Sequence, residues 1–108
     1  EISLTGPTKV IRNKREFIIN PSDFGIHSLK AEEISGGSNI PSSARIFTEV
    51  LNGQGSEAQN NVVCANAAMA IATTTNCGPK EGFEKAKESL LSGKANEAFK
   101  KLQKLSSR

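Results

Sequence analysis

The sequence is poor in aromatic residues: among its 108 residues there are five phenylalanines and no tryptophan or tyrosine. A core built from this chain therefore has to rest on isoleucine, valine, leucine and alanine. A chain of this length has room for one domain with a modest core. Its longest strongly apolar run, residues 62–72, is too short to cross a bilayer, which takes about 20 residues. The composition thus predicts a single domain and no membrane partner.

Residues that commonly carry chemistry are also scarce. The two cysteines, Cys64 and Cys77, form no CxxC or Cys/His pattern, so we expect no disulfide framework and a cytoplasmic location. Cys64 lies in the apolar run and is typical of a small buried residue. The one histidine, His27, follows a glycine turn, where a surface position is more common than a catalytic one. There is no phosphate-binding loop of the P-loop or dinucleotide type.

Charge is distributed unevenly along the chain. Residues 1–78 carry six basic and seven acidic side chains, whereas residues 79–108 carry eight basic and four acidic ones. A basic end can indicate an anionic partner such as nucleic acid. Here the lysines alternate with glutamates and are not interleaved with aromatic residues, so the pattern favours solvated helices and makes nucleic acid an improbable partner.

Two short β-branched stretches, residues 8–11 and 16–20, predict an antiparallel hairpin with Asn13 in its turn. In the second stretch Phe17 and Ile19 share one face and Ile18 lies on the other. Apolar residues on both faces predict a sheet that is covered on both sides. Because an isolated hairpin is only marginally stable, these strands are expected to lie beside others.

Helical spacing of apolar residues predicts four helices after the hairpin. The first covers residues 42–52 and the second residues 56–74, with Ser56 as N-cap. The third begins at Pro79, with an apolar stripe of Phe83, Ala86, Leu90 and Leu91. The fourth follows Gly93, and we expect the last two to pack antiparallel at the surface. Residues 29–34 are predicted to form a single helical turn.

The fold class is therefore α/β: a hairpin that contributes to a mixed sheet, plus about four helices. One hairpin is too little sheet for a self-sufficient domain of this class. We expect residues 1–108 to be the C-terminal portion of a larger α/β domain, without a second domain in this chain.

The second helix has an unusual composition, because residues 62–72 are apolar on every side. Such a helix is normally buried all round. Its many alanines would allow neighbouring backbones to come close. Asn66 interrupts the run, and a buried amide without partners costs about 1–3 kcal/mol. We expect it to bond a carbonyl of a neighbouring loop.

Two places could hold a charged ligand. Glu1 precedes the Ser/Thr-rich stretch SLTGPT, and a carboxylate at such a junction can bind Mg²⁺ alongside substrate phosphates. Most glutamates of this kind are simply solvated. The glycine-rich loop SGGS at residues 35–38 could present backbone N–H groups to an anion, but such loops are usually only turns.

The order of four motifs carries a family resemblance over the whole chain. They are EISLTGPTKV, NPSDFGI, VLNGQG followed by NVVCANAAMAIA, and EGFEKAKESLLSGKANEAFKKLQKL. In this order they resemble the C-terminal part of the anthranilate phosphoribosyltransferase family, within the nucleoside phosphorylase and phosphoribosyltransferase superfamily. The resemblance loosens at residues 38–44, where the family commonly has an acid-rich run.

The resemblance implies an enzyme that moves phosphoribose from phosphoribosyl pyrophosphate to anthranilate in tryptophan biosynthesis, with Mg²⁺ as cofactor. It implies that Glu1 matches the second acid of an Asp-Glu pair that helps to bind the metal, and that no catalytic residue lies in this segment. The family's other substrate-binding motifs and its N-terminal helical domain are absent from these residues. We therefore expect a fragment, inactive alone, of an enzyme that forms a homodimer.

Two alternatives remain open at this point. A pyrimidine nucleoside phosphorylase of the same superfamily would share the architecture, although such chains usually continue into another domain. A diverged paralogue that binds nucleic acid is the third possibility. The acceptor substrate, the oligomeric state and the role of residues 35–43 are not determined by the sequence.

Overall fold

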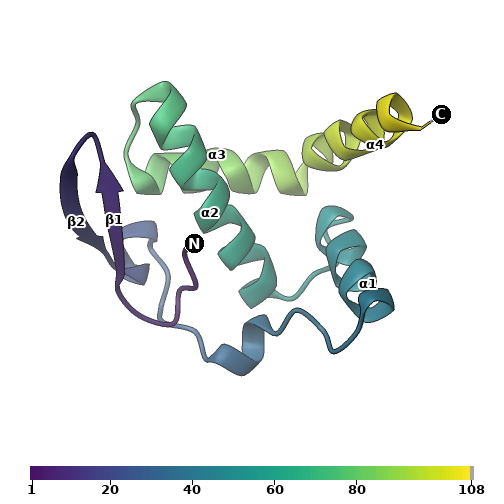
Figure 1. The fold of residues 1–108 in the computed structure, drawn as a ribbon, viewed down its shortest axis with the longest axis horizontal. Helices are drawn as coiled ribbons and strands as arrows, with labels where there is room; N and C mark the ends of the chain where they lie inside the picture. The colour runs from purple at the N-terminus through teal and green to yellow at the C-terminus, as the bar shows by residue number, and fades with distance from the viewer. Residues whose placement is uncertain (108) are drawn as a thin grey trace.

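The computed structural model describes residues 1–107 and confirms an α/β chain (Figure 1). Its strands are β1 (Thr8–Arg12) and β2 (Arg15–Ile19), followed by the short 3-10 turns η1 (Pro21–Phe24) and η2 (Ala31–Ile34). The helices are α1 (Ile40–Leu51), α2 (Glu57–Thr75), α3 (Pro79–Leu91) and α4 (Lys94–Ser106). The predicted hairpin, the single turn and all four helices are therefore present, with ends that differ by a few residues.

The hairpin closes through a two-residue turn. Arg12 pairs with Arg15, and both residues between them have positive φ, 51° at Asn13 and 64° at Lys14. This is the backbone of a type I′ turn, whose twist matches that of the strands it joins. Asparagine adopts this conformation readily, whereas lysine does so at a cost.

Only one face of the hairpin is covered by described residues. Ile19 is buried at the end of β2, and Val10 packs on the core from the same face. On the opposite face Ile11 is 68% exposed and Ile18 is 57% exposed. Residues 1–107 contain no third strand beside β1 or β2. The prediction of a sheet covered on both sides is therefore wrong for this part of the chain taken alone.

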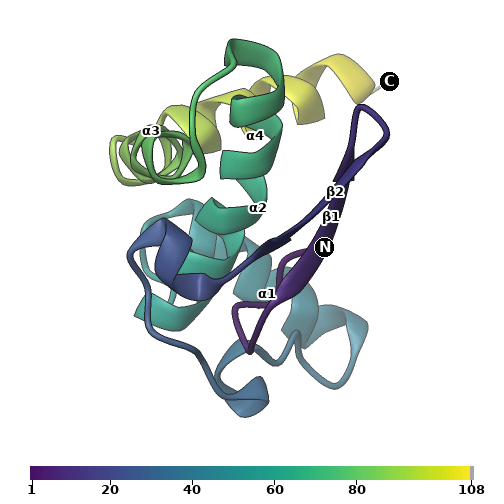
Figure 2. The same cartoon turned by 90° about the vertical axis from the view of Figure 1, so that its left-hand side faces the viewer.

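The core forms where α2 and α3 cross, with the hairpin end and η1 beside them (Figure 2). A Cβ added at Gly82 of α3 would lie 2.7 Å from the carbonyl oxygen of Ala68 on α2, so glycine is required for this approach. The ring of Phe83, next to that glycine, packs at 6.1 Å from the ring of Phe24 of η1. The prediction that short side chains bring backbones together is confirmed.

Helix α2 is enclosed on one side only. Its buried residues, Cys64, Ala65, Ala68 and Ala72, face the core, whereas Val63 is 45% exposed and Ala70 is also exposed. The expectation that the helix is buried all round is wrong for residues 1–107, which supply neighbours to one face. None of the described helices combines the length and apolarity needed to cross a membrane.

Helix α4 does not fold back along α3. It continues outward from the end of α3 after a two-residue link, in which Gly93 has φ 87° (Figures 1 and 2). Besides contacts with α3 near the link, it contacts α1: the Phe99 and Phe47 rings meet edge to face at 4.9 Å, and Asn96 donates to Asn52. The antiparallel prediction is wrong because these contacts direct α4 away, leaving Leu91, Leu102 and Leu105 exposed.

The turn geometry gives a first test. Replacing Lys14 with glycine should raise the free energy of unfolding by about 0.5–1 kcal/mol, because glycine adopts a positive φ without the steric cost that lysine bears. Urea unfolding measures the change. Lys9→Gly, in the adjacent strand, is the control and should lower stability. Equal losses from both variants would contradict the turn assignment.

The helix crossing gives a second test. In an exposed helix, alanine is more stable than glycine by about 1 kcal/mol. At Gly82 we expect the opposite sign, a loss of about 1–2 kcal/mol, because the added methyl group would press on the Ala68 carbonyl. Thermal unfolding of Gly82→Ala measures this. Gly36→Ala is the control, since nothing lies within 4 Å of its added Cβ. A more stable Gly82→Ala protein would disprove the close crossing.

Candidate functional site

The first five residues form a segment with alternating burial. Ile2 and Leu4 are buried in the core, whereas Glu1 and Thr5 are exposed and Ser3 is half-buried. The buried pair anchors the segment against the helices. The alternation therefore leaves Glu1 and Thr5 exposed, with Ser3 half-buried between them.

Leu4 has an unusual combination of backbone and side chain. Its φ is 63°, in the left-handed region, although its side chain is completely buried. Its carbonyl oxygen accepts a hydrogen bond of 2.8 Å from the backbone N–H of Leu29. A bulky residue holds this conformation only where its surroundings determine it, and such positions are concentrated at functional sites. The path of the segment is thus set by tertiary contacts.

Asn66 of α2 binds the same segment from the other side. The backbone N–H of Ile2 donates to its Oδ1 at 2.8 Å, and its Nδ2 donates to the Ile2 carbonyl oxygen at 2.7 Å. Nδ2 also donates to the Val62 carbonyl oxygen, one helical turn back, at 2.8 Å. The amide thus pairs with Ile2 as a neighbouring strand would. The prediction that Asn66 bonds a loop carbonyl is confirmed, and the bond to the Ile2 N–H adds to it.

Glu1 is the candidate metal ligand in this segment. Its exposed carboxylate takes no part in the ion pairs or hydrogen bonds formed by residues 1–107. Two and four positions further along, the hydroxyls of Ser3 and Thr5 lie 2.7 Å apart. The described residues hold no group of three His, Cys, Asp or Glu able to bind a metal by themselves. One carboxylate fits an Mg²⁺ ion held mainly by phosphates and water, which is its usual mode in proteins.

The other two candidates are His27 and the SGGS loop. His27 is exposed in the loop between η1 and η2 and makes no hydrogen bond within the described part of the chain. At the end of the SGGS loop the N–H groups of Ser38 and of the following Asn39 donate to the Ser42 hydroxyl. These two donors are already used to begin α1 and are not available to an anion.

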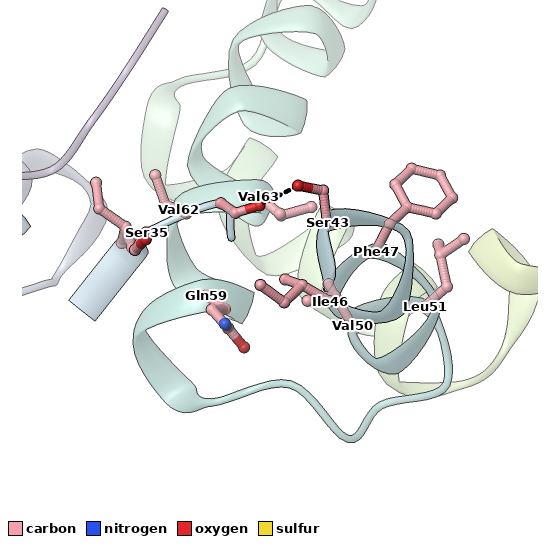
Figure 3. A pocket seen from close by; sticks show the side chains of 11 residues that line it. Ser35, Ser43, Ile46, Phe47, Val50, Leu51, Gln59, Val62 and Val63 are labelled. Carbon is pink, nitrogen blue, oxygen red and sulfur yellow. Dashed lines mark hydrogen bonds between the residues drawn. The ribbon is translucent and has the colours of Figure 1, made fainter. Parts of the chain in front are cut away.

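A groove of about 270 Å³ lies between η2, α1 and α2 (Figure 3). Two of its polar side chains are occupied: Ser43 donates to the Gly36 carbonyl, and the Gln59 side-chain oxygen accepts from the Ser56 N–H. A ligand site normally adds a few unoccupied polar groups that orient the ligand. The groove is therefore an apolar surface, lined by Ile34, Ser35, Gly36, Ser43, Ile46, Phe47, Val50, Leu51, Gln59, Val62 and Val63.

Cys64 is buried and unpaired, as the sequence indicated, and Cys77 is partly exposed. Burial raises the pKa of the Cys64 thiol; nearby Lys87 opposes this shift and Glu84 adds to it. A raised pKa keeps the thiol protonated and unreactive. Cys64 is consequently a packing residue of α2.

Sequence reasoning missed two features of this site. It noticed Asn66 as a polar residue in an apolar helix, but its pairing with Ile2, 64 positions away, leaves no local signal. The left-handed backbone of Leu4 also has no signal, because leucine rarely adopts that conformation.

Comparison with known proteins gives a consistent result. Residues 1–96 match the family model described as glycosyl transferase family, a/b domain. Proteins named anthranilate phosphoribosyltransferase from Flavobacterium johnsoniae and Christiangramia forsetii are each 64% identical over 106 residues, 98% of this chain. The protein of that name from Cytophaga hutchinsonii is 45% identical over 102 residues, 94% of this chain and 31% of its own length. The chain spans about a third of the length of these relatives, 32% for the first two.

The cysteines give a third test. In the folded protein iodoacetamide at pH 8 should modify Cys77 at least about tenfold faster than Cys64, because the Cys64 thiol is buried and stays protonated. Folding disfavours the Cys64 thiolate, so the raised pKa of this thiol also makes stability depend on pH. The free energy of unfolding should fall as the pH rises above the ordinary thiol pKa of about 8.5, because the unfolded chain then ionises more readily than the folded protein. Peptide mass mapping over time measures both rates. Equal rates in the folded protein would contradict the packing of α2.

Proposed function

The chain belongs to the glycosyl transferase family with an a/b domain, and on that basis we propose that it is part of an anthranilate phosphoribosyltransferase. The observation that carries this proposal is 64% identity to two proteins of that name over 98% of the chain. The reaction proposed is transfer of phosphoribose from phosphoribosyl pyrophosphate to the amine of anthranilate, a step in tryptophan biosynthesis.

In this proposal Glu1 is a metal-binding residue. The amine of anthranilate displaces pyrophosphate from C1 of the ribose, and negative charge accumulates on the leaving pyrophosphate. When bound, Mg²⁺ supplies the compensating positive charge. Glu1 would hold the ion with its free carboxylate, from a segment anchored by Ile2 and Leu4. We assign no proton transfer to any residue of this chain, and the donor and acceptor would be bound mainly by residues outside it.

We further propose that residues 1–108 are the C-terminal portion of one larger α/β domain. Three uncovered surfaces support this: the exposed face of the hairpin with Ile11 and Ile18, the exposed side of α2 with Val63, and the apolar groove. Further strands and helices of the same protein would cover them. The relatives are about three times as long as this chain, which is compatible with such a domain.

Three further features remain predictions. They are a homodimeric enzyme, a cytoplasmic location and lack of activity in these residues alone. The two unpaired cysteines suit a reducing compartment. Gel filtration of the purified natural protein tests the homodimer. Its intact mass tests the larger domain, and a mass near that of 108 residues would count against that domain.

Replacing Glu1 tests the metal role. In the full-length protein Glu1→Gln should raise the Mg²⁺ concentration needed for half-maximal phosphoribosyl transfer by about 10- to 100-fold. Glutamine has the shape of glutamate but lacks its negative charge, so the variant loses a charged metal ligand. Initial rates with phosphoribosyl pyrophosphate and anthranilate, measured over a range of Mg²⁺, give this value.

Glu32→Gln is the matched control, since Glu32 is also exposed and without an ion pair in the described residues. It should leave the Mg²⁺ requirement unchanged. The same Mg²⁺ dependence in both variants would remove Glu1 from the metal site. Turnover of a pyrimidine nucleoside with phosphate, and none with anthranilate, would replace the proposed reaction by that of a nucleoside phosphorylase.

A further inference from the structure

We propose that Asn66 is a positioning residue for Glu1: its side-chain amide fixes the backbone on the C-terminal side of Glu1 and thereby the position of the Glu1 Cα, from which the carboxylate reaches the metal. This inference rests on the metal role proposed for Glu1 above. Asn66 touches neither metal nor substrate in this scheme and acts through the backbone of Ile2.

The geometry of the peptide group makes the link between the two residues direct. The Ile2 N–H that donates to Asn66 belongs to the peptide unit joining Glu1 to Ile2. Because a peptide unit is planar, holding its N–H also holds the Glu1 carbonyl and the Glu1 Cα in the same plane. The second hydrogen bond, to the Ile2 carbonyl, holds the next peptide unit. Rotation about the Glu1 Cα–C bond and the side-chain torsions of Glu1 remain free, so the hydrogen bonds fix the position of the Glu1 Cα, from which the side chain extends.

Asn66 is itself held firmly. Its Nδ2 has two donor hydrogens, and both are used, one by the Ile2 carbonyl and one by the Val62 carbonyl of the same helix. Its Oδ1 accepts from Ile2, which leaves the amide no equally good flipped orientation. Ala65 beside it is completely buried, so the helix is fixed at this level. The amide is therefore a rigid support rather than a mobile surface group.

The segment has other anchors, and these separate positioning from general stability. The buried side chains of Ile2 and Leu4, and the bond from the Leu29 N–H to the Leu4 carbonyl, hold the segment without Asn66. The Asn66 bonds act at the end nearest Glu1. Losing them should release the Glu1 peptide unit locally, while Leu4 and the residues after it stay in place.

Two variants and one matched control test this in the full-length protein. Asn66→Ala removes the amide, and Asn66→Asp keeps its shape and acceptor while losing the donor. Asn61→Ala removes an amide from the same helix, one that makes no hydrogen bond in the described residues. Three quantities are measured: hydrogen exchange at the Ile2 amide, the KM for anthranilate, and the affinity for Mn²⁺, a probe for Mg²⁺, in the presence of phosphoribosyl pyrophosphate.

We expect both Asn66 variants to weaken Mn²⁺ binding, Asn66→Ala by about 10-fold, the size of effect seen when the support of a metal ligand is removed. Asn66→Ala should also speed exchange at Ile2. The KM for anthranilate should stay the same, and Asn61→Ala should behave as the unmodified protein. Combining Asn66→Ala with Glu1→Gln should weaken Mn²⁺ binding no further than Glu1→Gln alone, because Asn66 acts through Glu1.

Normal Mn²⁺ affinity in both Asn66 variants would overturn the inference, even if Ile2 exchanged faster, because Asn66 would then serve only the fold. Additive losses in the double variant would also overturn it. Failure of the proposed reaction would give a different result. The unmodified protein would transfer no phosphoribose to anthranilate, while Glu1→Gln and Asn66→Ala would each still weaken Mn²⁺ binding.

Discussion

The structure depends on how closely other chain segments can approach helix α2. Its core-facing side chains are small, Cys64, Ala65, Ala68 and Ala72, so neighbouring backbone comes nearly into contact with it. The α3 backbone passes at Gly82, and the first residues of the chain lie close enough for Asn66 to pair with Ile2. Larger side chains on this face would move both α3 and the first residues of the chain away from α2. The compact core and the placement of Glu1 therefore share one cause.

Features set by local physics could be predicted from the sequence. The hairpin followed from alternating β-branched residues around Asn13, and the start of α2 from Ser56, whose side chain accepts from the Gln59 N–H as an N-cap does. Pro79 marked the start of α3 in the same way. Each of these signals acts within a few residues, so no tertiary information was needed.

Features that depend on distant contacts could not be predicted. The direction of α4 is set by Phe47 and Phe99, which lie far apart in the sequence, and a short link containing glycine is compatible with several directions. Leu91 joined a predicted apolar stripe but is exposed, because helical spacing marks an apolar face without saying what covers it. The role of Glu1 stays a prediction, and the pairing of Asn66 with Ile2 could not be predicted, because it depends on which helix lies beside the first residues of the chain.

The conformation of Leu4 has a consequence for which residues position 4 can accept. Its enclosed pocket requires a large apolar side chain, so glycine, the easiest residue for its backbone, would leave a void. Branching at Cβ would crowd the left-handed backbone, which disfavours valine and isoleucine although they are equally apolar. Two opposing requirements thus leave a narrow set of unbranched-Cβ side chains such as leucine and methionine. Exchanges that are conservative by hydrophobicity alone would not be conservative at this position.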